Sequence, residues 1–146
     1  MKIAIGCDHG AFDLKNAGAE HLHSRGFEVC DFGTYSNASC DYPDYAAAAA
    51  RAVASGECEK GIVLCTTGIG ISIAANKVKG IRCALLSDLM SAKMTRLHND
   101  TNMMALGAAV VGKGLALEIV DTWLDTPFSG EEKHVRRINK ITALEE

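Results

Sequence analysis

One cysteine stands where a strand pattern meets a glycine-containing turn. Cys65 follows the apolar run 62–64, which is typical of a buried parallel strand, and Gly68 and Gly70 come shortly after it. Backbone N–H groups in such a turn, and at the start of the helix expected after it, attract negative charge and favour the thiolate form of a nearby cysteine. The stretch 61–80 therefore predicts an activated thiol beside an anion-binding turn. Glycine motifs this short also occur as purely structural turns.

Two further polar pairs have the residue types that proton transfer needs. Asp8 and His9 follow the first strand pattern, and His98 and Asn99 follow a later helical pattern. Together with Cys65, and with a hydroxyl from Thr67, they provide acids, bases and hydrogen-bond donors. Turn amides would then hold the oxyanion that forms when a proton leaves a carbon next to a carbonyl. Each residue also has a structural interpretation, such as a helix cap for Asp8 or a C-terminal charge partner for His98.

Strand and helix patterns alternate along the chain. Strands are expected at 2–7, 27–31, around 62–64, at 81–86 and at 103–111, and helices at about 12–25, 44–55, after the turn at 68–70, and at 88–97, 115–124 and 131–144. This alternation predicts an α/β fold, a three-layer α/β/α sandwich with a Rossmann-like five-stranded parallel sheet and a C-terminal helix. Without a linker or repeat, residues 1–146 are expected to form a single domain.

The strand order decides whether the polar loops meet. In open parallel sheets, ligands bind beyond the carboxyl ends of the strands, where the strand order reverses. If the order begins 2-1-3, the crevice lies between the ends of the first and third strands. The Asp8-His9 pair and the loop 65–70 would then converge there.

Composition excludes several classes of partner. A net charge of −3 gives no electrostatic reason to expect nucleic acid, and no apolar run is long enough to cross a membrane. The six cysteines have no C-x-x-C spacing, and the chain starts directly on a strand pattern, so we expect reduced thiols and a cytoplasmic location. The five histidines show no zinc-ligand spacing, and the loop G-C-D-H-G lacks the three-glycine dinucleotide fingerprint. Neither a metal nor a cofactor is expected.

Four ordered motifs resemble those of a known family. They are K-I-A-I-G-C-D-H-G at 2–10, D-F-G-T-Y with D-Y-P at 31–43, C-T-T-G-I-G-I-S-I-A-A-N-K-V-K-G-I-R at 65–82, and H-N-D-T-N-M-M-A-L-G at 98–107. They closely resemble the type B ribose-5-phosphate isomerases and the related galactose-6-phosphate and allose-6-phosphate isomerases. The resemblance covers essentially the whole chain.

The resemblance implies a cofactor-free aldose–ketose isomerase that moves a proton between C1 and C2 of a sugar phosphate through a cis-enediolate. Cys65 matches the base, because Ile71 occupies the position where another branch of the family has a glutamate. The other matches are Thr66, Gly68, Ile69 and Gly70 for the enediolate cradle, Asp8, Thr67 and His98 for ring opening, Asn99 for a substrate hydroxyl, and His9 and Arg137 for the phosphate.

Three positions depart from the family pattern. Thr66 replaces the glycine usual after the cysteine, Ala109 stands where a phosphate-binding arginine is common, and Lys133 replaces an arginine of the tail. Lysine cannot reproduce the bidentate grip of a guanidinium group. Arg136 is a candidate substitute.

The resemblance also implies a homodimer in which the segment 98–99 of one subunit completes the site of the other, or a tetramer formed by two such dimers. Ribose 5-phosphate and ribulose 5-phosphate are the expected substrates. A six-carbon sugar phosphate, favoured by the missing arginine, is the alternative. A non-catalytic sugar-phosphate binding module on the same fold is the third hypothesis.

Overall fold

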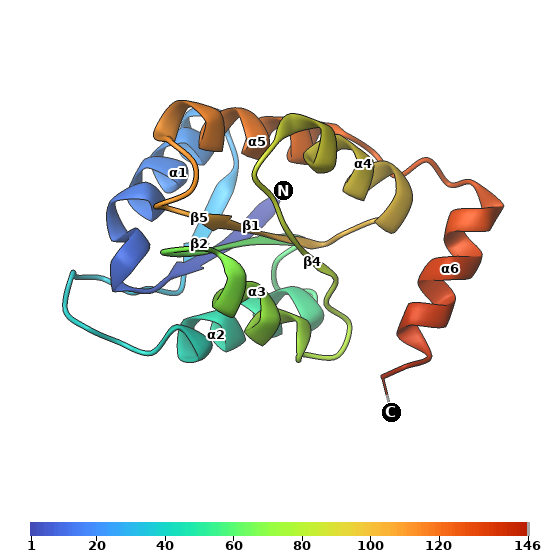
Figure 1. The fold of residues 1–146 in the computed structure, drawn as a ribbon, viewed down its shortest axis with the longest axis horizontal. Coiled ribbons are helices and arrows are strands. Elements are labelled where there is room, and N and C mark those ends of the chain that lie inside the picture. The colour runs from blue at the N-terminus through green and yellow to red at the C-terminus, as the bar shows by residue number, and fades with distance from the viewer. Residues whose placement is uncertain (146) are drawn as a thin grey trace.

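The centre of the molecule is a five-stranded parallel sheet, seen in a computed structural model that describes residues 1–145 (Figure 1). The strand order is β2-β1-β3-β5-β4, and each neighbouring pair is parallel. The strands are β1 (Lys2–Cys7), β2 (Glu28–Asp31), β3 (Lys60–Cys65), β4 (Cys83–Leu85) and β5 (Met103–Gly107). The order begins 2-1-3, which is the condition under which the two polar loops converge, and the reversal therefore lies between β1 and β3.

Helices cover both faces of this sheet and confirm the three-layer α/β/α architecture (Figure 1). Helices α1 (Phe12–Ser24), α4 (Leu89–Asn99) and α5 (Lys113–Asp125) lie on one face, and α2 (Tyr42–Ala54) and α3 (Ile69–Asn76) lie on the other. A single 3₁₀ turn, η1 (His9–Ala11), joins β1 to α1, and α6 (Glu132–Thr142) ends the described chain.

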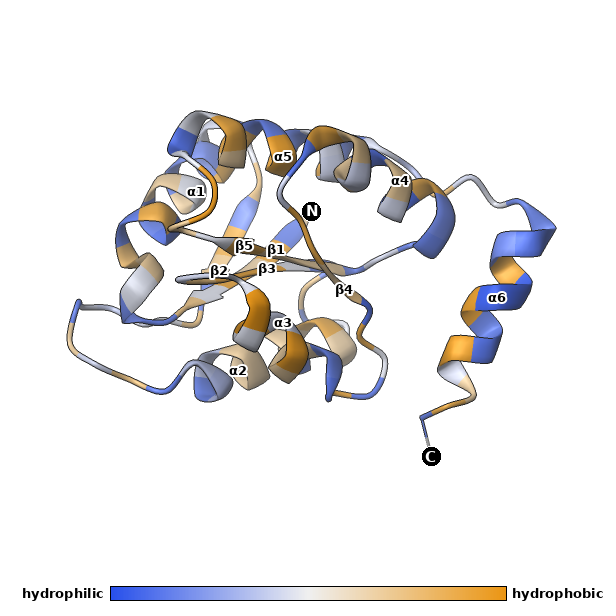
Figure 2. Ribbon diagram, in the orientation of Figure 1, coloured by the Kyte–Doolittle hydropathy of each residue, from blue (hydrophilic) through white to orange (hydrophobic). Residues whose placement is uncertain are grey.

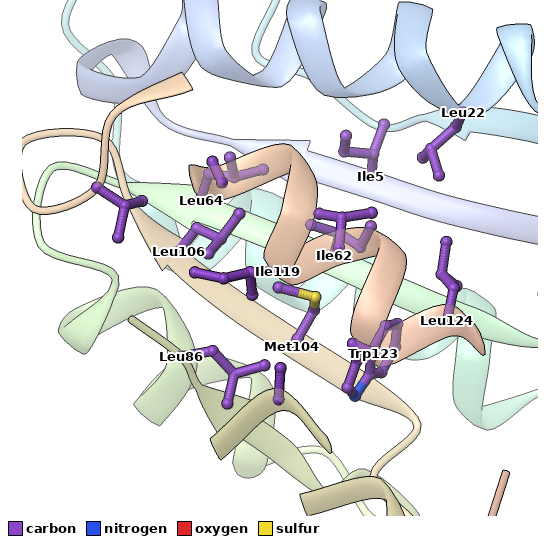
Figure 3. Packing of buried hydrophobic residues seen from close by; sticks show 14 of the residues in the cluster. Ile5, Leu22, Ile62, Leu64, Leu86, Met104, Leu106, Ile119, Trp123 and Leu124 are labelled. Carbon is purple, nitrogen blue, oxygen red and sulfur yellow. The ribbon is translucent and has the colours of Figure 1, made fainter. Parts of the chain in front are cut away.

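Each face of the sheet has its own hydrophobic core. On the α1/α5 face, leucine, isoleucine and methionine side chains of β1, β3 and β5 pack against Leu22, Ile119 and Trp123 (Figure 3). Trp123 is fully buried, and its indole N–H donates to Thr101 Oγ1 at 3.0 Å. On the other face, the alanine-rich side of α2 packs on the sheet and on α3, because small side chains allow close approach.

Two strand predictions were wrong in extent. The fifth strand ends at Gly107, not at residue 111, because the backbone N–H groups of Val110 and Val111 both donate to the Gly107 carbonyl at 3.0 Å and fold the chain into a turn. The fourth strand is only Cys83–Leu85, since the chain just before it runs in a loop, where the Arg82 N–H donates to Asn102 Oδ1 at 2.9 Å. The helix predicted at 115 starts two residues earlier, at Lys113.

Helix α6 stands apart from the sandwich, beside α4 (Figure 1). It alternates apolar and charged residues around its circumference (Figure 2), yet Val135 and Ile141 are exposed. His134 is its one buried residue, and the ring stacks on His98 of α4 with 4.4 Å between centroids. Apart from this contact with α4, residues 1–145 leave most of the apolar side of the amphipathic helix α6 uncovered.

Candidate active site

Cys65 is the last residue of β3 and lies at the carboxyl edge of the sheet. Its side chain is only 5% exposed, and the backbone N–H of Gly68 donates to Sγ at 3.1 Å. A donor directed at sulfur stabilises a thiolate more than a neutral thiol, because hydrogen bonds to ionised groups are the stronger ones. The fold therefore holds one thiol with an amide donor directed at it.

The turn that carries this amide requires glycine at position 68. Gly68 has a φ of 78°, in the left-handed region, and precedes the first residue of α3. A Cβ there would lie 2.8 Å from the Leu106 carbonyl carbon and 2.9 Å from the Gly107 nitrogen. Gly107 is needed for the same reason, since a Cβ on it would strike the backbone of Thr67. The turn is thus in direct contact with the end of β5.

The predicted cradle, residues 66–70, forms this turn and the first residues of α3. Two of its amides are already engaged, since Gly68 N–H donates to Cys65 Sγ and Ile69 N–H donates to Thr67 Oγ1 at 3.3 Å. The N-cap residue of α3, Gly68, has no side chain to cap the helix, so the next two first-turn N–H groups, of Gly70 and Ile71, are available to an anion. The exposed side chain of Thr66 lies over Gly10. The Thr66 backbone is not in the left-handed region, since Asp100 is the one non-glycine residue among residues 1–145 that has a positive φ.

Asp8 joins the ends of β1 and β3. Its backbone N–H donates to the Leu64 carbonyl at 3.2 Å, and its Oδ1 accepts from Gly10 N–H at 3.0 Å. Asp8 is 7% exposed, and its carboxylate caps the 3₁₀ turn η1 and not α1, whose N-cap is Ala11. The predicted meeting of the Asp8-His9 pair with the loop 65–70 is also found.

His9 lies at the mouth of a cavity of about 490 Å³ between the starts of α1 and α5. The backbone N–H of Cys40 donates to His9 Nδ1 at 3.2 Å, and the Cys40 sulfur lies 3.8 Å from the same nitrogen. Because Nδ1 accepts a hydrogen bond, the neutral imidazole carries its proton on Nε2. His9 is thereby prepared to donate from Nε2 to an anion.

His98 and Asn99 end α4, which returns the chain from β4 to the start of β5. They lie toward the amino edge of the sheet, where the Asn102 carbonyl accepts from Gly61 N–H at 3.0 Å. Cys65 is at the opposite edge, and six residues of β3 separate the edges by roughly 16–20 Å. One chain alone therefore does not bring His98 or Asn99 to the thiol.

The basic residues of α6 are also remote from His9. Lys133 pairs with Glu131 at 3.7 Å, and Arg136 pairs with Glu132 on the same helix at 2.8 Å. Arg137 is exposed and forms no ion pair among residues 1–145. Beside this segment, burial and the nearby His98 ring lower the pKa of His134. The residues of α6 that were predicted to bind the phosphate thus do not lie beside His9 of their own chain.

Three residues near the site were missed by sequence reasoning. The Tyr42 ring lies against Gly70, where a Cβ would come within 2.7 Å of it. The backbone N–H of Cys40 donates to His9 Nδ1, and Lys113 lines the cavity beside His9. Tyr42 lies in the D-Y-P motif, but no role at the site was predicted for it, and the helix was expected to start only at residue 44. The other two contacts join segments 31 and 104 residues apart, for which one sequence carries no signal.

Residues 1–145 contain no group of three or more His, Cys, Asp or Glu side chains arranged to hold a metal ion. Within the same range, no helix is both long and apolar enough to cross a membrane.

Comparisons with known proteins agree on one family. The family model described as Ribose/Galactose Isomerase matches residues 3–141. The chain is 52% identical to ribose-5-phosphate isomerase B of Escherichia coli, over 99% of this chain and 97% of that protein. It is 42% identical to galactose-6-phosphate isomerase subunit LacB of Clostridium acetobutylicum, over 99% of this chain and 83% of that protein. The solved ribose-5-phosphate isomerase B of Clostridium thermocellum superposes with a TM-score of 0.98 at 56% identity, covering 99% of this chain and 97% of that one.

Proposed function

Because the chain belongs to the ribose/galactose isomerase family, we propose that it interconverts ribose 5-phosphate and ribulose 5-phosphate, with Cys65 as the general base. The observation that carries this proposal is the buried Cys65 sulfur, which accepts a hydrogen bond from Gly68 N–H at 3.1 Å beside the uncapped start of α3. A base and an oxyanion site side by side are what proton transfer next to a carbonyl requires.

The proposed reaction begins with the open-chain aldose in the crevice between β1 and β3. The Cys65 thiolate removes the proton from C2, the C1 carbonyl oxygen becomes the enediolate oxygen, and the cradle amides stabilise its charge. The Cys65 thiol then returns a proton to C1, and the O2 proton moves to O1, which gives the ketose and restores the thiolate, so the reaction needs no external oxidant or reductant. Asp8 and Thr67, with a partner's His98, open the sugar ring. Ile71 is fully buried and apolar, which leaves Cys65 as the base in this loop.

A substrate panel tests the substrate assignment. Ribose 5-phosphate is expected to have a higher kcat/KM than allose 6-phosphate or galactose 6-phosphate. The six-carbon alternative has one specific observation in its favour, the 42% identity to a galactose-6-phosphate isomerase subunit. A higher kcat/KM with either six-carbon substrate would establish that alternative. Calorimetric binding of sugar phosphates with no turnover of any of them would instead establish a binding module.

We propose further that the active form is a homodimer, or a tetramer of two dimers, with sites shared between subunits. His98 and Asn99 cannot reach Cys65 of their own chain, and α6 leaves much of its apolar side uncovered. Exposed apolar side chains also surround the carboxyl edge, at Ile69, Ile73, Leu85, Met90 and Val110. A second copy would cover them and bring its own residues 98–99 to the crevice. All six cysteines are free, which fits the reducing cytoplasm proposed for the protein.

Subunit mixing tests the shared site. Cys65→Ala and His98→Ala homodimers should each have low activity, because every site lacks one group. A mixed dimer has one doubly defective site and one intact site. With random pairing, half the dimers are mixed, so co-refolded protein should recover about one quarter of wild-type activity. Recovery no greater than the sum of the two variants would show that each site is built from one chain.

A further inference from the structure

The cavity beside His9 opens between two helix starts at the carboxyl edge of the sheet. It has a volume of about 490 Å³, and its walls come from η1 and the first turn of α1 on one side and from residues 108–113 on the other. A cavity of this size falls within the range of small-molecule sites.

Backbone hydrogen bonds fix this cavity relative to Cys65. The N–H groups of Ala108 and Ala109 donate to the carbonyls of Cys65 and Thr66, each at 2.9 Å. The ends of β1 and β5 flank the end of β3, and each neighbouring pair of strands is about 4.8 Å apart. A ligand anchored between His9 and the start of α5 therefore has its other end beside the thiol.

Lys113 supplies positive charge to this cavity. It is the first residue of α5, it lines the cavity together with His9, and it forms no ion pair with any of residues 1–145. One carboxylate, Asp13, also lines the cavity, but its exposed position leaves it hydrated. His9 adds the Nε2 donor that the Cys40 amide leaves free.

We propose that Lys113 binds the phosphate group of the substrate and is a specificity-determining residue of this enzyme. Ala109, on the same loop, has no polar side-chain atom. The positive charge on this side of the cavity therefore comes from Lys113, four residues later in the chain. An ammonium group and an imidazole N–H facing one cavity suit a phosphate dianion, with the sugar carbons extending past Thr66 toward Cys65. This inference rests on the proposed function, because the phosphate belongs to that substrate.

The test compares Lys113→Met, which keeps the length of the side chain, with Lys113→Arg and with a control, Lys79→Met. Lys79 is exposed in the connection between α3 and β4 and does not line the cavity. Loss of one charged contact is expected to raise KM for ribose 5-phosphate about 10- to 100-fold, with a smaller effect on kcat. Lys113→Arg should restore most of the affinity, and Lys79→Met should behave as the wild type.

Two readouts separate a phosphate contact from general damage. The inhibition constant of inorganic phosphate should rise by the same factor as KM in Lys113→Met, and kcat/KM for unphosphorylated ribose should be unchanged. Unchanged KM and unchanged phosphate inhibition would overturn the role of Lys113. If the wild type isomerises no sugar phosphate, the proposed function fails, and direct calorimetry of inorganic phosphate binding to wild type and Lys113→Met still decides whether Lys113 binds it.

Discussion

Gly68→Ala is expected to damage both stability and turnover, because the added methyl group meets backbone on the far side of the turn. Holding alanine at a φ of 78° costs about 1 kcal/mol. The Cβ would also lie 2.8 Å from the Leu106 carbonyl carbon and 2.9 Å from Gly107 N. Relieving such overlap costs a further ~1–3 kcal/mol. The free energy of unfolding should therefore fall by about 2–4 kcal/mol, or roughly 6–15 °C in Tm.

The same overlap moves the amide that donates to Cys65. A shift of a few tenths of an ångström in a catalytic turn is expected to lower kcat by at least about tenfold. Gly56→Ala is the matched control, because Gly56 has a φ of 84° and nothing within 4 Å of an added Cβ. It should lose only ~1 kcal/mol of stability and no activity. Urea denaturation and initial rates measure both effects. Equal destabilisation by the two substitutions, with full kcat in Gly68→Ala, would refute the packing argument for this turn.

Two predictions concern titration and thiol access. The pKa of His134 is lowered by burial and by the adjacent His98 ring, so the unfolded state binds a proton at this residue more readily than the folded state. The free energy of unfolding should therefore fall as the pH drops through about 6.5. Between pH 8 and 5.5, Tm should fall further for wild type than for His134→Phe, and equal losses of Tm would contradict this. Iodoacetamide should alkylate the half-buried Cys40 before Cys65, which is 5% exposed, but loss of activity should follow the alkylation of Cys65 and be slowed by substrate. Mass spectrometry over time measures the order of alkylation. Loss of activity that follows the alkylation of Cys40 alone would contradict this prediction.

Local sequence patterns were sufficient to predict the parallel sheet and the turn after Cys65. The apolar run before Cys65 and the glycines after it are contiguous, and the alternation of strand and helix patterns determines a parallel sheet with a crevice at the reversal of strand order. These features depend on residues that are close together in the chain, so they can be predicted from a single sequence.

What sequence reasoning missed depends on contacts between distant segments. The close approach of Gly107 to Thr67 and the contact of the Tyr42 ring with Gly70 each join segments that are far apart in the chain. The residues of α4 that were predicted to join the site, His98 and Asn99, were recognisable by motif, but only the topology shows that they lie at the opposite edge of the sheet from Cys65. Lys113 had no distinguishing pattern, because its place in the cavity follows from how α5 is packed.

The central claim is that the Cys65 thiolate transfers the proton, and single-turnover measurement on Cys65→Ala tests it most directly. Ribose 5-phosphate incubated with wild type in deuterated water should acquire deuterium at C1 of the ketose, followed by NMR. Removing a general base should lower the rate of isomerisation and of label incorporation by about 10²–10⁴-fold while the thermal unfolding midpoint stays near that of the wild type. A well-folded Cys65→Ala protein that isomerises and labels its product within about threefold of the wild-type rate would contradict the assignment.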